Sequence, residues 1–185
     1  MGKNINGTLI NQSATIVEKA GADITDVRNK LLKYDASGNV VLATSGAAPL
    51  VGIAIIEAGA NDISGNDSGK VLTGEDVDVQ IKDIGYVIAS AAISKGAEVT
   101  ATTGGLAKTA TTGEHVIGIA LSAATAANDY VRVQITKYQK ADGDATGLKL
   151  SDLADVDFTT PATDGQVLKY DGTATKWKPG NDATE

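Results

Sequence analysis

The chain has 185 residues, a formal net charge of -7 and no cysteine. An acidic balance without a run of Lys or Arg argues against direct binding to nucleic acid or to an anionic membrane surface, and the lack of cysteine excludes disulfides and thiolate metal sites. No apolar run approaches the length of a membrane span, so we expect no membrane insertion.

Aromatic residues make up 4% of the chain, whereas hydrophobic residues make up 42%. The core must therefore be built from Val, Ile, Leu and Ala. Many β-branched residues alternate with 21 glycines, which favours short strands joined by tight turns over long helices. The composition predicts an all-β protein.

Residues 1–13, "MGKNINGTLINQS", are polar around the three apolar side chains Ile5, Leu9 and Ile10. Such a segment cannot form a core, so we predict an N-terminal arm that docks by adding a strand to a partner's exposed sheet edge. An ordinary frayed terminus is the alternative. The segment also lacks the apolar stretch of a secretory signal, so we expect a soluble protein that is synthesised in the cytoplasm.

Residues 14–138 contain an internal repeat. The matching segments are "LVGIAIIEA" (50–58) with "VIGIALSAA" (116–124), and "VDVQIKD" (77–83) with "VRVQITK" (131–137). Each unit is predicted to run as strand, glycine turn, strand, "GIA" strand, loop and "VxVQI" strand, with extra residues in the first unit near 59–73. The repeat predicts a compact barrel or sandwich of two pseudo-repeated units that cover each other's apolar faces.

The spacing of apolar residues supports these strands. Val77, Val79 and Ile81 alternate with polar residues, as in a half-buried strand. The "GIA" segments are apolar at consecutive positions, which indicates strands buried on both faces, and their glycines mark bulges or close backbone approach. Two short helices are also suggested, at 24–32 and 88–94.

After Tyr138 the chain becomes polar and rich in Gly and Asp, which predicts a linker over 139–147. Residues 148–185 then form a small module in which "DGQVLKYDGTATKW" indicates a β-hairpin around Asp171–Gly172. The phrase "LKYD" occurs here and also at 32–35. Both copies are predicted to be a strand that ends in an Asx turn.

The C-terminal module is too small to bury a core alone, so we expect it to need partner copies. The apolar residues predicted to make a trimer contact are Leu150, Leu153, Val156, Phe158 and Val167. Trp177 could stack on a sugar, but a lone tryptophan in so small a module is more often its core anchor, and that reading is favoured.

No catalytic, cofactor or metal site is predicted. His115 is the only histidine and precedes a strand, and there is no Gly-x-Ser-x-Gly motif. The stretch 142–153 begins like a calcium loop, but Leu153 stands where a bidentate glutamate is needed. Paired carboxylates and the loop 61–69 are interpreted as solvated, so the sequence predicts a protein that is not an enzyme.

The body resembles the capsid decoration (cement, or head-fibre) proteins of tailed bacteriophages. The pattern runs from "LLKYDASGNVVLAT…PLVGIAIIEA" through "GEDVDVQIKDIGYVIASAAISKGAEVTATTGGLAKTAT" to "VIGIALSAATAANDYVRVQI". The tail is similar to a short module of phage fibre proteins, through "LSDLADVD" and "DGQVLKYD…W". The loop near 59–73 departs from the most compact members of the first family.

The resemblance implies a structural virion protein on the outer surface of the capsid. Its expected partners are the major capsid protein and itself, as a homotrimer that projects the C-terminal module. The alternative is a fibre-like or adhesin-like module that recognises host glycans or another virion protein. The sequence leaves the order of the strands open.

Overall fold

The computed structural model describes residues 14–64, 67–141 and 149–182. The chain divides into two compact units, Met1–Ala141 and Asp142–Glu185. Strands dominate both units, as the composition predicted, and no helix in the described ranges is long and apolar enough to cross a membrane. The body is described first and the C-terminal unit after it.

The body contains two five-stranded sheets. The first has the order β1-β5-β4-β2-β3, from β1 (Thr15–Lys19), β2 (Leu31–Tyr34), β3 (Val40–Leu42), β4 (Gly52–Ala54) and β5 (Asp76–Gln80). The second has the order β6-β10-β9-β7-β8, from β6 (Ile84–Ile88), β7 (Glu98–Thr102), β8 (Leu106–Thr109), β9 (His115–Ala120) and β10 (Tyr130–Gln139). A short 3-10 turn, η1 (Thr103–Gly105), joins β7 to β8.

The two orders become identical when β1 is matched with β6, and each later strand with the strand five places on. Equivalent isolated bridges support the match, because Ala20 pairs in parallel with Val40 and Ala89 pairs in parallel with Ala107. These bridges join the first strand of each sheet to the strand at its opposite edge, so each sheet closes as a small barrel. The predicted pair of pseudo-repeats is confirmed.

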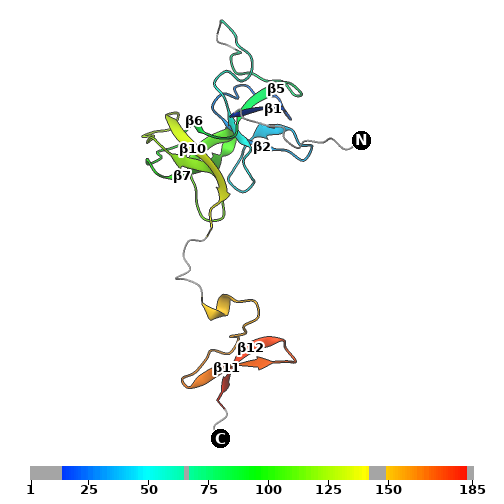
Figure 1. The fold of residues 1–185 in the computed structure, drawn as a ribbon, viewed down its shortest axis with the longest axis vertical. Helices are drawn as coiled ribbons and strands as arrows, with labels where there is room; N and C mark the ends of the chain where they lie inside the picture. The colour runs from blue at the N-terminus through cyan, green and yellow to red at the C-terminus, as the bar shows by residue number, and fades with distance from the viewer. Residues whose placement is uncertain (1–13, 65–66, 142–148, 183–185) are drawn as a thin grey trace, which may run out of the picture. The chain divides into compact units, whose positions relative to one another are not determined.

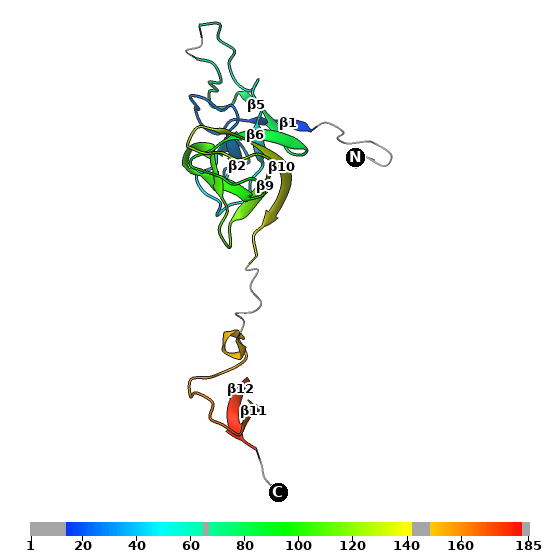
Figure 2. The same ribbon diagram turned by 90° about the vertical axis from the view of Figure 1, so that its left-hand side faces the viewer.

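The two barrels lie side by side (Figure 1), and they are seen from a second direction in Figure 2. Leu31, Leu50 and Ile53 of the first repeat belong to the same buried cluster as the inward side chains of the second. Backbone hydrogen bonds also cross between the repeats, from the Gly105 N–H to the Ala43 carbonyl at 2.8 Å. The first repeat therefore contributes to the core of the second, whereas its other buried residues form a separate cluster of their own.

The predicted helices at 24–32 and 88–94 are wrong. The first range is an irregular connection that leads into β2; in it Ile24 bridges to Val71, and the Val27 N–H donates to the Gly69 carbonyl at 2.9 Å. The second begins at the end of β6 and continues to Ile93, which bridges to Ala124. Apolar side chains at three- and four-residue spacing reach the core from these irregular connections, so the spacing imitates a helix.

The connection between β4 and β5 is longer than its equivalent between β9 and β10 and extends away from both sheets (Figure 1). Backbone hydrogen bonds between Ala60 and residues 69–70 close the base of this excursion. Val71, which bridges to Ile24, is the structural equivalent of Ala124. The additional residues therefore precede Val71, where the sequence predicted them.

The C-terminal unit contains a 3-10 turn, η3 (Leu150–Asp152), and an antiparallel hairpin of β11 (Gln166–Asp171) and β12 (Lys176–Asn181). The segment before the hairpin runs beside β12, because the Asp157 N–H donates to the Trp177 carbonyl at 2.8 Å. The predicted hairpin is confirmed.

Both copies of "LKYD" end in an Asx turn. The Asp35 carboxylate accepts hydrogen bonds from the N–H groups of Ser37 and Asn39, at 2.8 and 2.9 Å. The Asp171 carboxylate accepts from those of Thr173 and Ala174. The repeated phrase thus forms the same local structure, a strand that ends in an Asx turn, in both units.

Candidate interaction surfaces

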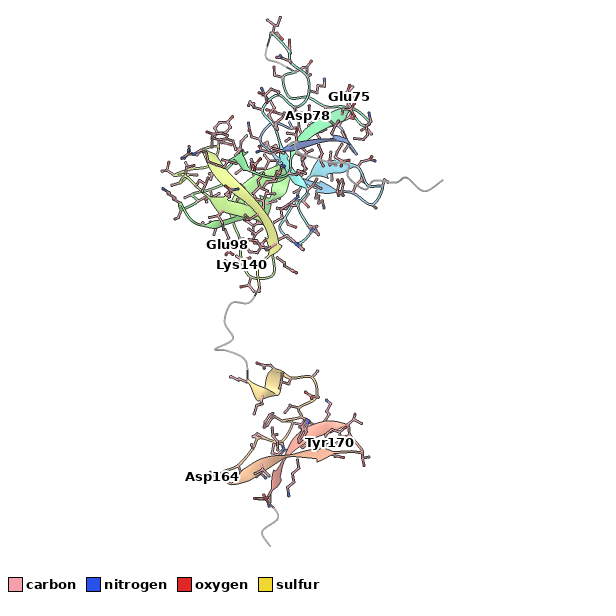
Figure 3. The ribbon with its side chains drawn as sticks, viewed as in Figure 1. Glu75, Asp78, Glu98, Lys140, Asp164 and Tyr170 are labelled. Atoms are coloured by element: carbon pink, nitrogen blue, oxygen red, sulfur yellow. The ribbon has the colours of Figure 1, made fainter. Side chains whose placement is uncertain are left out.

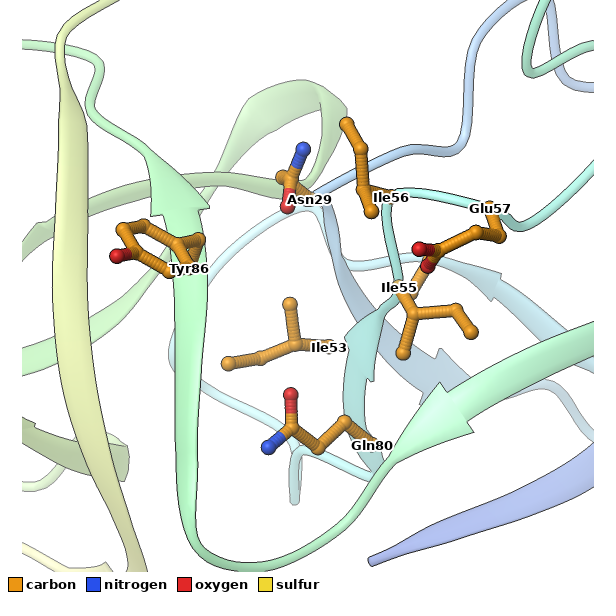
Figure 4. A pocket seen from close by; sticks show the side chains of 8 residues that line it. Asn29, Ile53, Ile55, Ile56, Glu57, Gln80 and Tyr86 are labelled. Carbon is orange, nitrogen blue, oxygen red and sulfur yellow. The ribbon is translucent and has the colours of Figure 1, made fainter.

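The pocket between the repeats has a volume of about 200 Å³. In Figure 4 Tyr86 extends from β6 on one side, and the segment that carries Ile55 and Ile56 lies on the other. The Gln80 side chain is held there, because its amide donates to the carbonyls of Lys82 and Ile84 at 3.0 and 2.8 Å. Glu57 is the one carboxylate in the lining, so the pocket offers no acid–base pair.

The outward face of the β6–β10 ladder is apolar and aromatic. Antiparallel register places Ile88 beside Tyr130, Tyr86 beside Arg132, and Ile84 beside Gln134, with all six pointing away from the buried valines. Tyr86 is 51% exposed and Tyr130 is 55% exposed. We call these six residues the aromatic face.

The equivalent face of the first repeat has a different chemistry. The β1–β5 ladder pairs Lys19 with Asp76, Val17 with Asp78, and Thr15 with Gln80. A hollow of about 600 Å³ adjoins it and is lined by four carboxylates, those of Glu57, Glu75, Asp76 and Asp78, together with Lys19. Figure 3 labels Glu75 and Asp78. We call the ladder residues and the hollow the acidic face.

The hairpin of the C-terminal unit also has two unlike faces. Cross-strand pairs place Tyr170 beside Trp177 and Leu168 beside Pro179 on one side. The rings of Tyr170 and Trp177 make an edge-to-face contact with centroids 5.4 Å apart. The opposite side carries Lys169 and Lys178, and Lys178 forms an ion pair with Asp171 at 3.1 Å.

The five predicted trimer-contact residues fall in different surroundings. Leu150 and Phe158 line the same hollow of about 350 Å³. Leu153 is exposed, whereas Val156 is buried and its backbone forms a parallel bridge with Trp177 of β12. Val167 is exposed on the lysine side of the hairpin. The structure thus brings two of the five together and leaves the trimer contact a proposal.

The prediction that Trp177 is the core anchor of the module is wrong for its side chain, which is 41% exposed. Its backbone is the part that anchors, through hydrogen bonds with Asp155 and Asp157. Sequence reasoning also missed Leu168, Tyr170 and Pro179 as partners of Trp177. Their alternation along two strands was the available signal, because residues two apart share a face.

The end of β10 is tied to β7 by a small polar network (Figure 3). The Glu98 carboxylate forms an ion pair with Lys140 and accepts a hydrogen bond from the Tyr138 hydroxyl at 2.6 Å. The hydrogen bonds from Lys140 and Tyr138 lower the pKa of Glu98, and burial with the bond to Glu98 raises the pKa of Tyr138 to about 12. This network fixes Lys140, although the expected linker begins at 139.

His115 is the first residue of β9, and its backbone is fully engaged. Its N–H donates to the Gly46 carbonyl at 2.7 Å, and its carbonyl accepts from the Thr100 hydroxyl. No group of three or more potential ligands gathers around a metal position within residues 14–64, 67–141 and 149–182. Ile5, Leu9 and Ile10, and most of the calcium-like stretch 142–153, lie outside the described residues.

No family model matches the sequence, and no curated protein sequence matches it. Among solved structures, the chain is similar to the N base of head fiber gp8.5 of bacteriophage phi29. The sequence identity is 17% and the TM-score is 0.47, over 68% of this chain and 97% of that chain.

Proposed function

We propose that this chain is a structural protein of a tailed-phage virion. It binds the outer surface of the assembled capsid through contacts with the major capsid protein and projects its C-terminal unit as a homotrimer. The sequence resemblance to decoration and fibre proteins supports this proposal in two separate parts of the chain. The double barrel is consistent with a structural role, because its two repeats are joined by one buried cluster and the pocket between them holds a single carboxylate, that of Glu57.

The observation that carries the proposal is the poorly covered C-terminal unit. Within residues 149–182, Val156 is the single hydrophobic side chain that is buried. Large apolar side chains on its surface include Leu150, Leu153, Tyr170 and Trp177. A unit of this size normally needs disulfides, a metal or oligomerisation. The chain has no cysteine, so association of copies is the favoured remaining source of stability.

Capsid stabilisation would follow from mass action. A protein that binds the assembled lattice and not its separated subunits shifts the equilibrium towards the lattice. Many copies, each held by three linked contacts, add avidity without any additional type of contact.

The test is co-sedimentation of the purified full-length chain with empty mature heads. We expect saturable binding and an increase in the temperature at which the heads open. A variant that lacks residues 2–11 measures the proposed arm, with Ile5, Leu9 and Ile10, in the same assay. Unchanged binding of that variant would place docking on the barrels, and absence of binding by the intact chain would overturn the proposal.

The alternative function is recognition of a glycan or of another virion protein by the C-terminal unit. The exposed Tyr170–Trp177 pair favours it, because aromatic faces flanked by polar side chains commonly stack on sugars. Binding of the full-length chain to a glycan array, lost in Trp177→Ala, would support this function. Head binding that survives the same substitution would show that the two functions are separate.

A further inference from the structure

The acidic and aromatic faces occupy the same place in the two repeats. In both ladders the cross-strand pairs keep one register, so Asp76 corresponds to Tyr130, Asp78 to Arg132 and Val17 to Tyr86. The inward residues of β5 and β10 are buried valines at equivalent positions, Val77 and Val79 in one and Val131 and Val133 in the other. The two repeats therefore share a backbone and an interior but differ in the chemistry of one outward face.

The two faces are complementary in charge. In the part of the chain that the structure describes, neither the Arg132 guanidinium nor the Asp78 carboxylate forms an ion pair. Lys19, the one cation in the acidic hollow, is already paired with Asp76 at 2.8 Å. The acidic face thus retains unbalanced negative charge, and the aromatic face presents an unpaired cation.

The two faces also suit each other in composition and form. Tyr and Arg are the residues most enriched at the energetic centres of protein interfaces, and the aromatic face holds two tyrosines and an arginine. The acidic hollow of about 600 Å³ offers concave space with carboxylates at its wall. Exposed tyrosines beside an arginine are suitable occupants of such a hollow, because their rings bury apolar area while their hydroxyls keep polar partners.

We propose that the body associates head to tail: the aromatic face of one copy binds the acidic face of the next. The occupant of each face is therefore a second copy of this chain. A contact between two unlike faces is heterologous, and such a contact closes into a ring when its rotation permits. A threefold ring needs this type of contact, so the inference rests on the homotrimer of the proposed function and identifies the surfaces that form it.

Site-specific cross-linking tests the proposal in the full-length chain, which has no cysteine of its own. Val17→Cys places a thiol on the acidic face, and Ile84→Cys places one on the aromatic face; both side chains are exposed. With a short bis-maleimide, the double variant should give covalent dimers and trimers on a denaturing gel. Each single variant should remain monomeric, because in a head-to-tail ring identical positions do not meet.

Charge reversal supplies the second readout. Arg132→Glu in the double-cysteine variant should lower the cross-linked fraction about tenfold, because it sets like charges against each other. Asp78→Lys in the same chain should restore cross-linking. Lys95→Glu makes the same charge change at an exposed residue between β6 and β7 and should have no effect.

Light scattering on the wild-type chain and head co-sedimentation separate the possible failures. A trimer without cross-linking in the double variant overturns the head-to-tail contact and leaves the trimer intact. Cross-linked dimers of a single-cysteine variant would show that the same face of two copies meets, which would also overturn the head-to-tail contact. A monomer at high concentration overturns both the contact and the homotrimer, and head binding then decides whether the capsid-binding function stands.

Discussion

Two glycines show how one packing constraint is imposed twice. A Cβ atom built on Gly52 would lie 2.2 Å from the Gln80 carbonyl oxygen, and one on Gly118 would lie 1.9 Å from that of Gln134. In each repeat the "GIA" strand passes so close to the "VxVQI" strand that only glycine fits. The sequence predicted a close approach but not its partner, because the partner lies on a different strand.

Gly118→Ala should destabilise the body by about 2 kcal/mol or more, since backbone atoms rather than a flexible side chain occupy the required space. Thermal unfolding followed by circular dichroism measures this as a lower melting temperature. Gly172→Ala is the matched control, because a Cβ there has open space within 4 Å. Equal melting temperatures for the two variants would contradict the close approach.

At the level of elements, periodicity predicted the strands well and the connections poorly. Alternation in the "VxVQI" strands reports burial directly, because one side of each ladder faces the core. The helix predicted through Ile24 and Val27 was wrong because backbone hydrogen bonds to residues 69–71 hold this connection in place. The strand order could not be predicted for the same reason: pairing between distant segments leaves no local pattern.

The polar network at the end of β10 leads us to predict how the stability of the body depends on pH. Hydrogen bonds from Lys140 and Tyr138 lower the pKa of Glu98 below its ordinary value of 4.5. A carboxylate with a lowered pKa in the folded state stabilises the fold above its ordinary pKa, and this contribution is lost as the pH falls through the folded value. Glu98→Gln should therefore lower the melting temperature at neutral pH.

The difference between Glu98→Gln and the wild type should shrink as the pH falls below 4.5 and on through the lowered pKa of Glu98. Thermal melts across this range provide the measurement. Glu57→Gln makes the same charge change at an exposed carboxylate and should show no such convergence. A gap of constant size at all pH values would mean that Glu98 acts through packing and not through its charge.

For the whole molecule, the association of the C-terminal unit stays a prediction from the sequence, and the sequence does not show which of its apolar residues share a face. Apolar residues in a small module indicate a need for partners, but the shared face of Leu168, Tyr170, Trp177 and Pro179 follows only from the hairpin register. The difference between the acidic and aromatic faces was equally hidden. Recognising it requires the two ladders to be aligned by structure, because the repeats are similar mainly at buried positions.

The extent of the body leads to a last prediction, on truncation. The Lys140 N–H donates to the Glu114 carbonyl, and its carbonyl accepts from the Gly113 N–H, so the body continues past Tyr138. A chain that ends at Ala141 should fold cooperatively, with the strand content of the body by circular dichroism. A chain that ends at Tyr138 also loses the ion pair to Glu98 and should be less stable by about 1–3 kcal/mol in urea. Equal stabilities of the two chains would show that residues 139 and 140 belong to the linker and not to the body. An unfolded chain ending at Ala141 would show that the body depends on the C-terminal unit.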